Sequence, residues 1–136
     1  MLNQSNKMAN YKFPMLNEGK RRDIHERIYK FALSVLDVTK FFPKTTENII
    51  LIRQVIRSSS SIGANASEAD GAESKKEFIH RFTIAKKEAK ESYYWLSLIC
   101  DHNLSLRKQF EPLLKENNEI ILIISKIIIN TKKNSK

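Results

Sequence analysis

The sequence predicts an all-α fold, an antiparallel up-and-down bundle of four helices. Four successive stretches repeat apolar residues at steps of three and four, the period of one helix face. Only short links separate these stretches, and short links make consecutive helices antiparallel neighbours. The chain has 136 residues, of which 41% are apolar and only 3 are glycine. This length fits one domain with a packed core, and so few glycines argue against an all-β fold with many tight turns.

The first helix is predicted over about residues 24–42. Asp23 and Glu26 have the spacing of a capping box, with Asp in place of the usual Ser or Thr. Pro43 ends the run, because proline cannot continue a helical hydrogen-bond ladder. The apolar face of this helix comprises Ile24, Ile28, Phe31, Ala32, Val35, Leu36 and Phe42.

The second helix is predicted from Thr45 or Thr46, either of which can cap it, to about Asp70, where Gly71 is a plausible stop. Its middle, residues 58–67, is rich in serine and contains Gly63. One interpretation is a linker that breaks the helix. We favour a continuous helix whose small residues let another backbone approach closely, because the stretch contains no proline.

The third helix is predicted over about residues 75–101. Ser74 and Glu77 form a capping box just before its first apolar residues, and Asn103 can lie at its C-terminal end. The apolar positions include Phe78, Ile79, Phe82, Ala85, Ala89, Tyr93, Leu96 and Ile99.

The fourth helix is predicted from Pro112, a residue that suits a first helical turn, to about residue 130. The isoleucine-rich run at 120–124 is also compatible with a strand. A single strand among three helices would have no pairing partner, so we favour the helix.

Most of the basic surplus lies at the two ends of the chain. The net charge is +9, of which residues 1–22 carry +4, residues 131–136 carry +3 and residues 23–130 carry +2. We therefore expect a flexible basic arm over 1–22, a nearly neutral bundle over 23–130 and a basic tail over 131–136. A basic surplus is typical of nucleic-acid partners, and its placement predicts that such binding depends on the two ends.

Lysines and arginines inside the bundle offer a second set of phosphate contacts. In the third helix the spacing predicts that Glu77 pairs with Arg81 and Lys87 with Glu91, which would leave an ordinary solvated face. Arg53 and Arg57 lie four residues apart, so we expect an acid such as Glu68 or Glu88, or a bound phosphate, to offset their repulsion. The candidate nucleic-acid contacts are Arg21, Arg22, Arg53, Arg57, Lys75, Lys76, Arg81, Lys86, Lys87, Lys90, Lys132 and Lys133.

No catalytic or metal-binding constellation is recognisable. A two-metal carboxylate site in a bundle needs two Glu-x-x-His units, and only the unit ending at His80 exists. Cys100 and His102 are two apart on a helix and would point away from each other. The serine run has no nearby histidine base. We expect a protein that is not an enzyme and has no cofactor, metal or small-molecule substrate.

Secretion and membrane signals are equally lacking. The first residues have no apolar signal-peptide core, and the longest apolar run is half of the roughly 20 residues that a membrane span needs. The single cysteine cannot form an internal disulfide. The expected location is the cytoplasm, with no membrane partner.

The third and fourth helices are apolar on more sides than one bundle requires. This excess predicts self-association, with a thick intramolecular core as the alternative. The candidate contacts between copies are Tyr93, Tyr94, Trp95, Leu98, Ile123 and Ile127.

Four motifs, in order along residues 24–130, resemble the bacterial "four helix bundle protein" family, whose founding members are encoded in intervening sequences of 23S ribosomal RNA genes. They are RQVIRS at 53–58, SIGANASEA at 61–69, SKKEFI at 74–79 and KEAKESYYWL at 87–96. The resemblance implies a homo-oligomer, a pentameric barrel, without known enzymatic activity. Related accessory proteins of diversity-generating retroelements bind nucleic acid and a reverse transcriptase. The resemblance also implies structural roles in polar networks and caps for Asn65, Glu68, Glu77 and Glu88, and the capping-box spacing gives Ser74 such a role.

Two hypotheses follow from these observations. In the first, a non-catalytic homo-oligomer associates with RNA, DNA or a nucleic-acid enzyme such as a reverse transcriptase through phosphate contacts. In the second, the protein is a structural oligomer or adaptor whose apolar faces bind itself or another protein.

Overall fold

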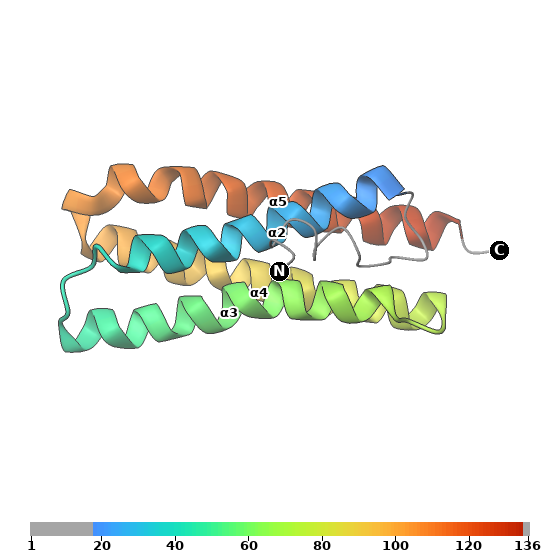
Figure 1. Cartoon of the computed structure of the whole chain (residues 1–136), viewed down its shortest axis with the longest axis horizontal. Coiled ribbons are helices and arrows are strands. Elements are labelled where there is room, and N and C mark those ends of the chain that lie inside the picture. The colour runs from blue at the N-terminus through green and yellow to red at the C-terminus, as the bar shows by residue number, and fades with distance from the viewer. Residues whose placement is uncertain (1–17, 135–136) are drawn as a thin grey trace, which may run out of the picture.

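The computed structural model describes residues 18–134, with side chains from Asp23 onward. Within this part of the chain lie four long α-helices and no strand, which confirms the all-α prediction. The helices lie lengthwise beside one another and alternate in direction (Figure 1). The elements are α2 (Glu18–Thr39), α3 (Thr46–Asp70), α4 (Lys75–His102), the short 3-10 helix η1 (Leu104–Leu106) and α5 (Arg107–Lys133).

Helix α2 begins and ends earlier than predicted. It starts at Glu18, so residues 18–22 are helical, whereas the predicted arm at 1–22 included them; residues 1–17 lie outside the described part. Gly19 is tolerated there because the first turn has no intrahelical N–H bonds to lose. At the other end, Phe42 lies beyond the helix, and its N–H bonds to the Thr39 carbonyl three residues back.

Helix α3 is continuous through its serine-rich middle, so the linker interpretation is wrong. The hydroxyls of Ser58, Ser59 and Ser60 bond to carbonyls of their own helix, as Ser58 does to Val55 at 3.3 Å, and so do not draw the backbone into a loop. Thr45 caps the start, where its side chain accepts from the Asn48 N–H. Gly71 closes the end with its N–H on the last-turn carbonyls.

The predicted cap of helix α4 is confirmed, with one difference. The Ser74 hydroxyl accepts from the Glu77 N–H at 3.0 Å. The Glu77 carboxylate accepts from the N–H of Glu73 at 3.0 Å, one residue before the donor of a standard capping box. At the other end the Asn103 N–H bonds to the Ile99 carbonyl.

Helix α5 begins five residues before Pro112 and ends at Lys133. Pro112 is therefore its sixth residue, and the helix absorbs one missing N–H bond there. The isoleucine run is helical, so the strand alternative is excluded. Lys132 and Lys133 extend the helix, which differs from the predicted tail at 131–136, because the apolar face continues to the buried Thr131.

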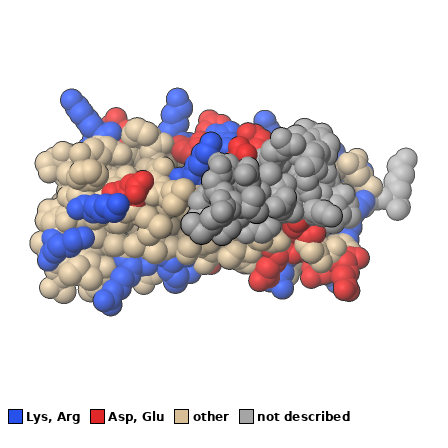
Figure 2. All heavy atoms as spheres, in the orientation of Figure 1, with Lys and Arg blue, Asp and Glu red and all other residues tan. Residues whose placement is uncertain are grey.

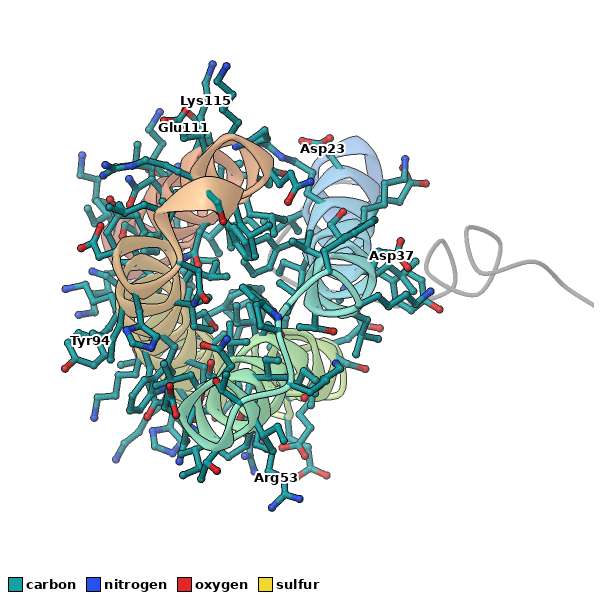
Figure 3. The ribbon with its side chains drawn as sticks, turned by 90° about the vertical axis from the view of Figure 1, so that its left-hand side faces the viewer. Asp23, Asp37, Arg53, Tyr94, Glu111 and Lys115 are labelled. Atoms are coloured by element: carbon teal, nitrogen blue, oxygen red, sulfur yellow. The ribbon has the colours of Figure 1, made fainter. Side chains whose placement is uncertain are left out.

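Viewed along its length, the bundle has one helix at each corner, with α2, α3, α4 and α5 following one another around the core (Figure 3). The closest packing joins α3 and α4, where small residues face each other and the Ser92 hydroxyl donates to that of Ser58 at 2.8 Å. Burial of each large core side chain contributes about 1.5–3 kcal/mol. The largest buried side chains include Phe31, Phe78, Phe82, Phe110, Ile62, Leu96 and Ile120.

Within residues 18–134, no helix combines the length and the apolarity that crossing a membrane requires. The same residues hold no group of three or more His, Cys, Asp or Glu side chains placed to bind a metal ion. The single cysteine, Cys100, is a buried core residue.

Candidate nucleic-acid interface

Several ion pairs among the described residues cross the seam between α3 and α4. Arg57 of α3 bonds to Glu88 at 3.3 Å and also to Glu91, both on α4. Arg81 of α4 bonds to Glu68 of α3 at 2.7 Å. The expectation that an acid offsets Arg57 is therefore confirmed.

The pairs predicted within the third helix do not form. Arg81 is bound to α3 rather than to Glu77, and Glu91 is bound to Arg57 rather than to Lys87. An ion pair at four-residue spacing within a helix stabilises it by only about 0.2–0.5 kcal/mol. Arg81 and Glu91 therefore pair with opposite charges on α3 in place of those on their own helix. The consequence is that Arg57 and Arg81 are occupied and Lys87 is not.

The seam also shifts two pKa values. The hydrogen bond that Arg57 donates to Glu91 raises the pKa of Arg57, which keeps the guanidinium charged. Burial raises the pKa of Glu88, and the nearby positive charge of Arg57 opposes this shift only in part.

Four lysines on the outer side of α4 remain without an ion pair among the described residues. These residues, the α4 lysine surface, are Lys76, Lys86, Lys87 and Lys90. Lys86 is half-buried and the other three are exposed.

Every acidic side chain of α4 is engaged elsewhere. Glu77 accepts the Glu73 N–H, and Glu88 and Glu91 bind Arg57. Asp101 lies 3.6 Å from Arg107. The sequence shows a nearly balanced helix, but the fold turns its acids toward partners and leaves the outer lysines unopposed.

The end of α5 adds further basic residues at one end of this surface. The Lys75 ammonium donates to the Asn134 carbonyl at 2.6 Å, which ties the start of α4 to the end of α5. Lys132 and Lys133 lie in that last turn of α5 and are exposed. Helix α2 also begins at this end of the bundle (Figure 1). It contains Arg21 and Arg22, whose side chains lie outside the described part.

Arg53 stands apart from the α4 lysine surface. It is exposed on α3 and points away from the bundle (Figure 3). It forms no ion pair within residues 23–134. The expected offsetting acid is therefore found at Arg57 and not at Arg53.

The residues predicted to join copies do not form one surface. Ile127 belongs to the core with 8% exposure, and Trp95 and Ile123 pack against the core. Tyr93 is half-buried. Tyr94 and Leu98 are exposed, at 59% and 39%.

The predicted polar network is formed only in part. Ser74, Glu77, Glu68 and Glu88 make the caps and ion pairs given above. Asn65 instead donates to the Ser61 carbonyl at 2.8 Å. That carbonyl is four residues back in the same helix, within reach of the Asn65 side chain.

Buried amides form a polar feature that the sequence patterns did not reveal. Asn117 lies in the apolar face of α5 and donates to the Ala89 carbonyl of α4 at 2.8 Å. Asn48 and Asn103 hydrogen-bond to each other. An asparagine at a core position of the helical repeat, as Asn117 is, is the signal that could have identified such a site.

A groove of about 310 Å³ lies between α2 and α3. Gly63 forms part of it, and a Cβ there would lie 3.3 Å from Ile28 Cγ2. Farther along these two helices are the exposed apolar residues Leu33, Leu36 and Ile50. Toward the end that carries the α2–α3 connection, Figure 2 shows uncharged residues with several Lys and Arg side chains among them. The groove is lined by Ile28, Tyr29, Ala32, Ser59, Ser60, Gly63, Ala64 and Ser67.

The chain matches a protein-family model and several solved structures. The model of the family described as 23S rRNA-intervening sequence protein matches residues 20–126. A crystal structure from Bacteroides thetaiotaomicron VPI-5482, described as a protein with unknown function from the S23 ribosomal protein family, shares 33% identity and a TM-score of 0.71. The match covers 77% of this chain and 97% of that one. No curated protein matches the chain.

Proposed function

Since the chain belongs to the 23S rRNA-intervening sequence protein family, we propose that it is a non-catalytic protein that associates with RNA or DNA, directly or beside a nucleic-acid enzyme such as a reverse transcriptase. The observation that carries the proposal is the α4 lysine surface, whose positive charge no acid of its own helix offsets. Phosphate oxygens supply the missing partners, and such contacts carry no information about base sequence.

Removing the positive charges of the α4 lysine surface, and the same number of charges elsewhere as a control, tests the proposal. Replacing Lys76, Lys86, Lys87 and Lys90 with glutamine should weaken binding of a labelled RNA or DNA. It should also make the slope of log affinity against log salt less steep by about 3 units, since each neutralised phosphate contributes about 0.7–0.9. Fluorescence anisotropy in rising salt measures both quantities.

The control removes the same charge outside α4. The exposed lysines Lys30, Lys44, Lys108 and Lys115 serve this purpose, and their replacement should change affinity less. Substituting Lys7 and Lys12 in the full chain asks whether the N-terminal residues dominate instead, as the charge distribution along the sequence predicts. Equal losses in all variants would show general charge attraction, and no binding at low salt would refute the proposal.

We also propose that the protein is a homo-oligomer, for which a pentamer is the expected form. Its support is the exposed apolar side chains on α2 and α3, including Leu33, Leu36 and Ile50, beside the small-residue groove. Light scattering after gel filtration should give a multiple of the 15.8 kDa chain mass. Glutamate at Leu36 and Ile50 should lower that mass, while glutamate at the exposed Leu122 of α5 should not.

A monomer at micromolar concentration would refute self-association. A partner protein that stays bound after nuclease treatment, with no effect of the lysine substitutions on nucleic acid, would favour the adaptor function instead.

A further inference from the structure

Tyr94 continues the outer face of α4 beyond the lysines. It lies four residues after Lys90 and seven after Lys87, which places all three on one side of the helix. Its side chain is 59% exposed and points away from the bundle (Figure 3). An aromatic ring with this exposure offers a stacking surface next to unopposed positive charge.

The protein holds this ring in place without burying it. The Tyr94 ring lies 5.1 Å from that of Trp95 at 73°, an edge-on contact. Trp95 itself packs against the core. An edge-on neighbour covers at most one side of the Tyr94 ring, so an open face remains. One turn farther, Leu98 adds exposed apolar surface.

Acidic residues near this surface are already occupied. Glu91 is bound to Arg57 across the seam, and Asp101 lies 3.6 Å from Arg107. A phosphate near Lys90 would therefore meet little repulsion. At a rise of 1.5 Å per residue, the Lys90 and Tyr94 positions are about 6 Å apart along the helix, close enough for one nucleotide to contact both.

We propose that the ligand of the α4 lysine surface is single-stranded nucleic acid, with one unpaired base stacked on Tyr94 and neighbouring phosphates on Lys87 and Lys90. This inference rests on the proposed function and specifies its partner. A duplex keeps its bases stacked on one another and cannot present a free base face to Tyr94. A single strand can, and stacking of one base on an aromatic side chain contributes about 1–3 kcal/mol irrespective of sequence.

The test compares three labelled probes of equal length with the full chain: a 20-nucleotide oligouridine, the same backbone without bases, and a 20-base-pair RNA duplex. Tyr94→Ala should weaken binding of the oligouridine about 5- to 150-fold, the equivalent of one stacked base. It should leave binding of the abasic strand and the duplex unchanged. Tyr94→Phe should retain the wild-type affinity, because the ring and not the hydroxyl carries the contact.

Two controls separate stacking from other roles of Tyr94. Leu122→Ala removes a comparably exposed apolar side chain on α5 and should leave all three affinities unchanged. Light scattering of Tyr94→Ala should show the wild-type mass. A lower mass would assign Tyr94 to contact between copies and overturn the inference.

The remaining outcomes distinguish this inference from the proposed function. If the lysine substitutions weaken binding and Tyr94→Ala does not, phosphate association stands and the stacking assignment is wrong. Equal affinity of the wild-type protein for all three probes would also show that phosphate contacts bind the strand and that no base stacks on Tyr94. If none of the probes binds at low salt, both proposals fail.

Discussion

The side-chain amides of Asn48 and Asn103 hydrogen-bond to each other in both directions, each Nδ2 to the other Oδ1, at 3.1 and 3.0 Å. Asn48 also donates to the Pro43 carbonyl at 3.0 Å, and Asn103 to the Ile99 carbonyl at 2.9 Å. The pair thus joins the first turn of α3, the segment before it and the end of α4. It fixes the register of two helices at one end of the bundle.

Replacing either amide should destabilise the protein. Asn48→Ala or Asn103→Ala should lower the free energy of unfolding by about 1–3 kcal/mol, because the remaining partly buried amide loses its partner. Urea denaturation measures this loss. The double variant should cost less than the two single losses added, whereas Asn118→Ala, on the exposed side of α5, should be nearly neutral. Strict additivity would show that the two amides act independently.

Close approach of α2 to α3 depends on Gly63. Gly63→Leu should lower the free energy of unfolding by about 1–3 kcal/mol, since the new side chain overpacks the space beside Ile28. Ala64→Leu, at the neighbouring exposed position, should stay within about 0.5 kcal/mol. Chemical denaturation of both variants checks the difference. Similar values for the two would show that α2 can shift freely over α3.

Stability should respond to pH through Glu88, whose pKa burial raises. A carboxyl with a higher pKa in the folded than in the unfolded protein favours folding while it is protonated. That contribution is present below the unfolded value and is lost as pH rises through the folded one. Glu88→Gln carries no titrating group at this position and does not lose this contribution. The free energy of unfolding of Glu88→Gln minus that of the wild type, measured by urea denaturation, should therefore increase from pH 3.5 to pH 7. The exposed Glu111→Gln is the control, and a difference that does not change with pH contradicts the prediction.

Cys100 should be chemically silent in the folded protein. It is 1% exposed, and burial raises the pKa of its thiol, with Arg107 opposing the shift. Reaction with a disulfide reagent at pH 8 should be at least about a hundredfold slower than in concentrated urea, because attack requires local opening. A cysteine introduced at the exposed Ser105 in a Cys100→Ala background gives the unhindered rate. Comparable native rates for the two thiols would mean that the end of α4 opens readily.

Much of the fold could be predicted because its signals are local. Thr45 and Ser74 cap their helices as their spacing indicates, and the apolar repeat identified the core, including Phe31, Phe78 and Ile120. The helix ends that were missed have weaker local signals. Glu18 starts α2 in a stretch without an apolar repeat, and Pro112 marks a second turn as readily as a first.

The candidate site was harder to predict, since exposure depends on neighbours. Tyr94 and Trp95 are adjacent in sequence, yet one is exposed and the other packs against the core. The apolar residues on several sides of the fourth helix predicted that Ile127 lies on the surface and contacts another copy. The fold instead buries Ile127 in the core. Periodicity identifies a face, whereas packing decides which part of that face the other helices cover.

By itself the sequence determined the order of the four helices in residues 18–134, most of their caps and the composition of the core, because propensity, capping and periodicity act within a few residues. Only the tertiary structure decided which charges cancel. Arg57 takes Glu88 and Glu91 from across the seam and leaves Lys87 and Lys90 unopposed. Charge pairing follows distance in space, and the packing of α3 on α4 sets that distance.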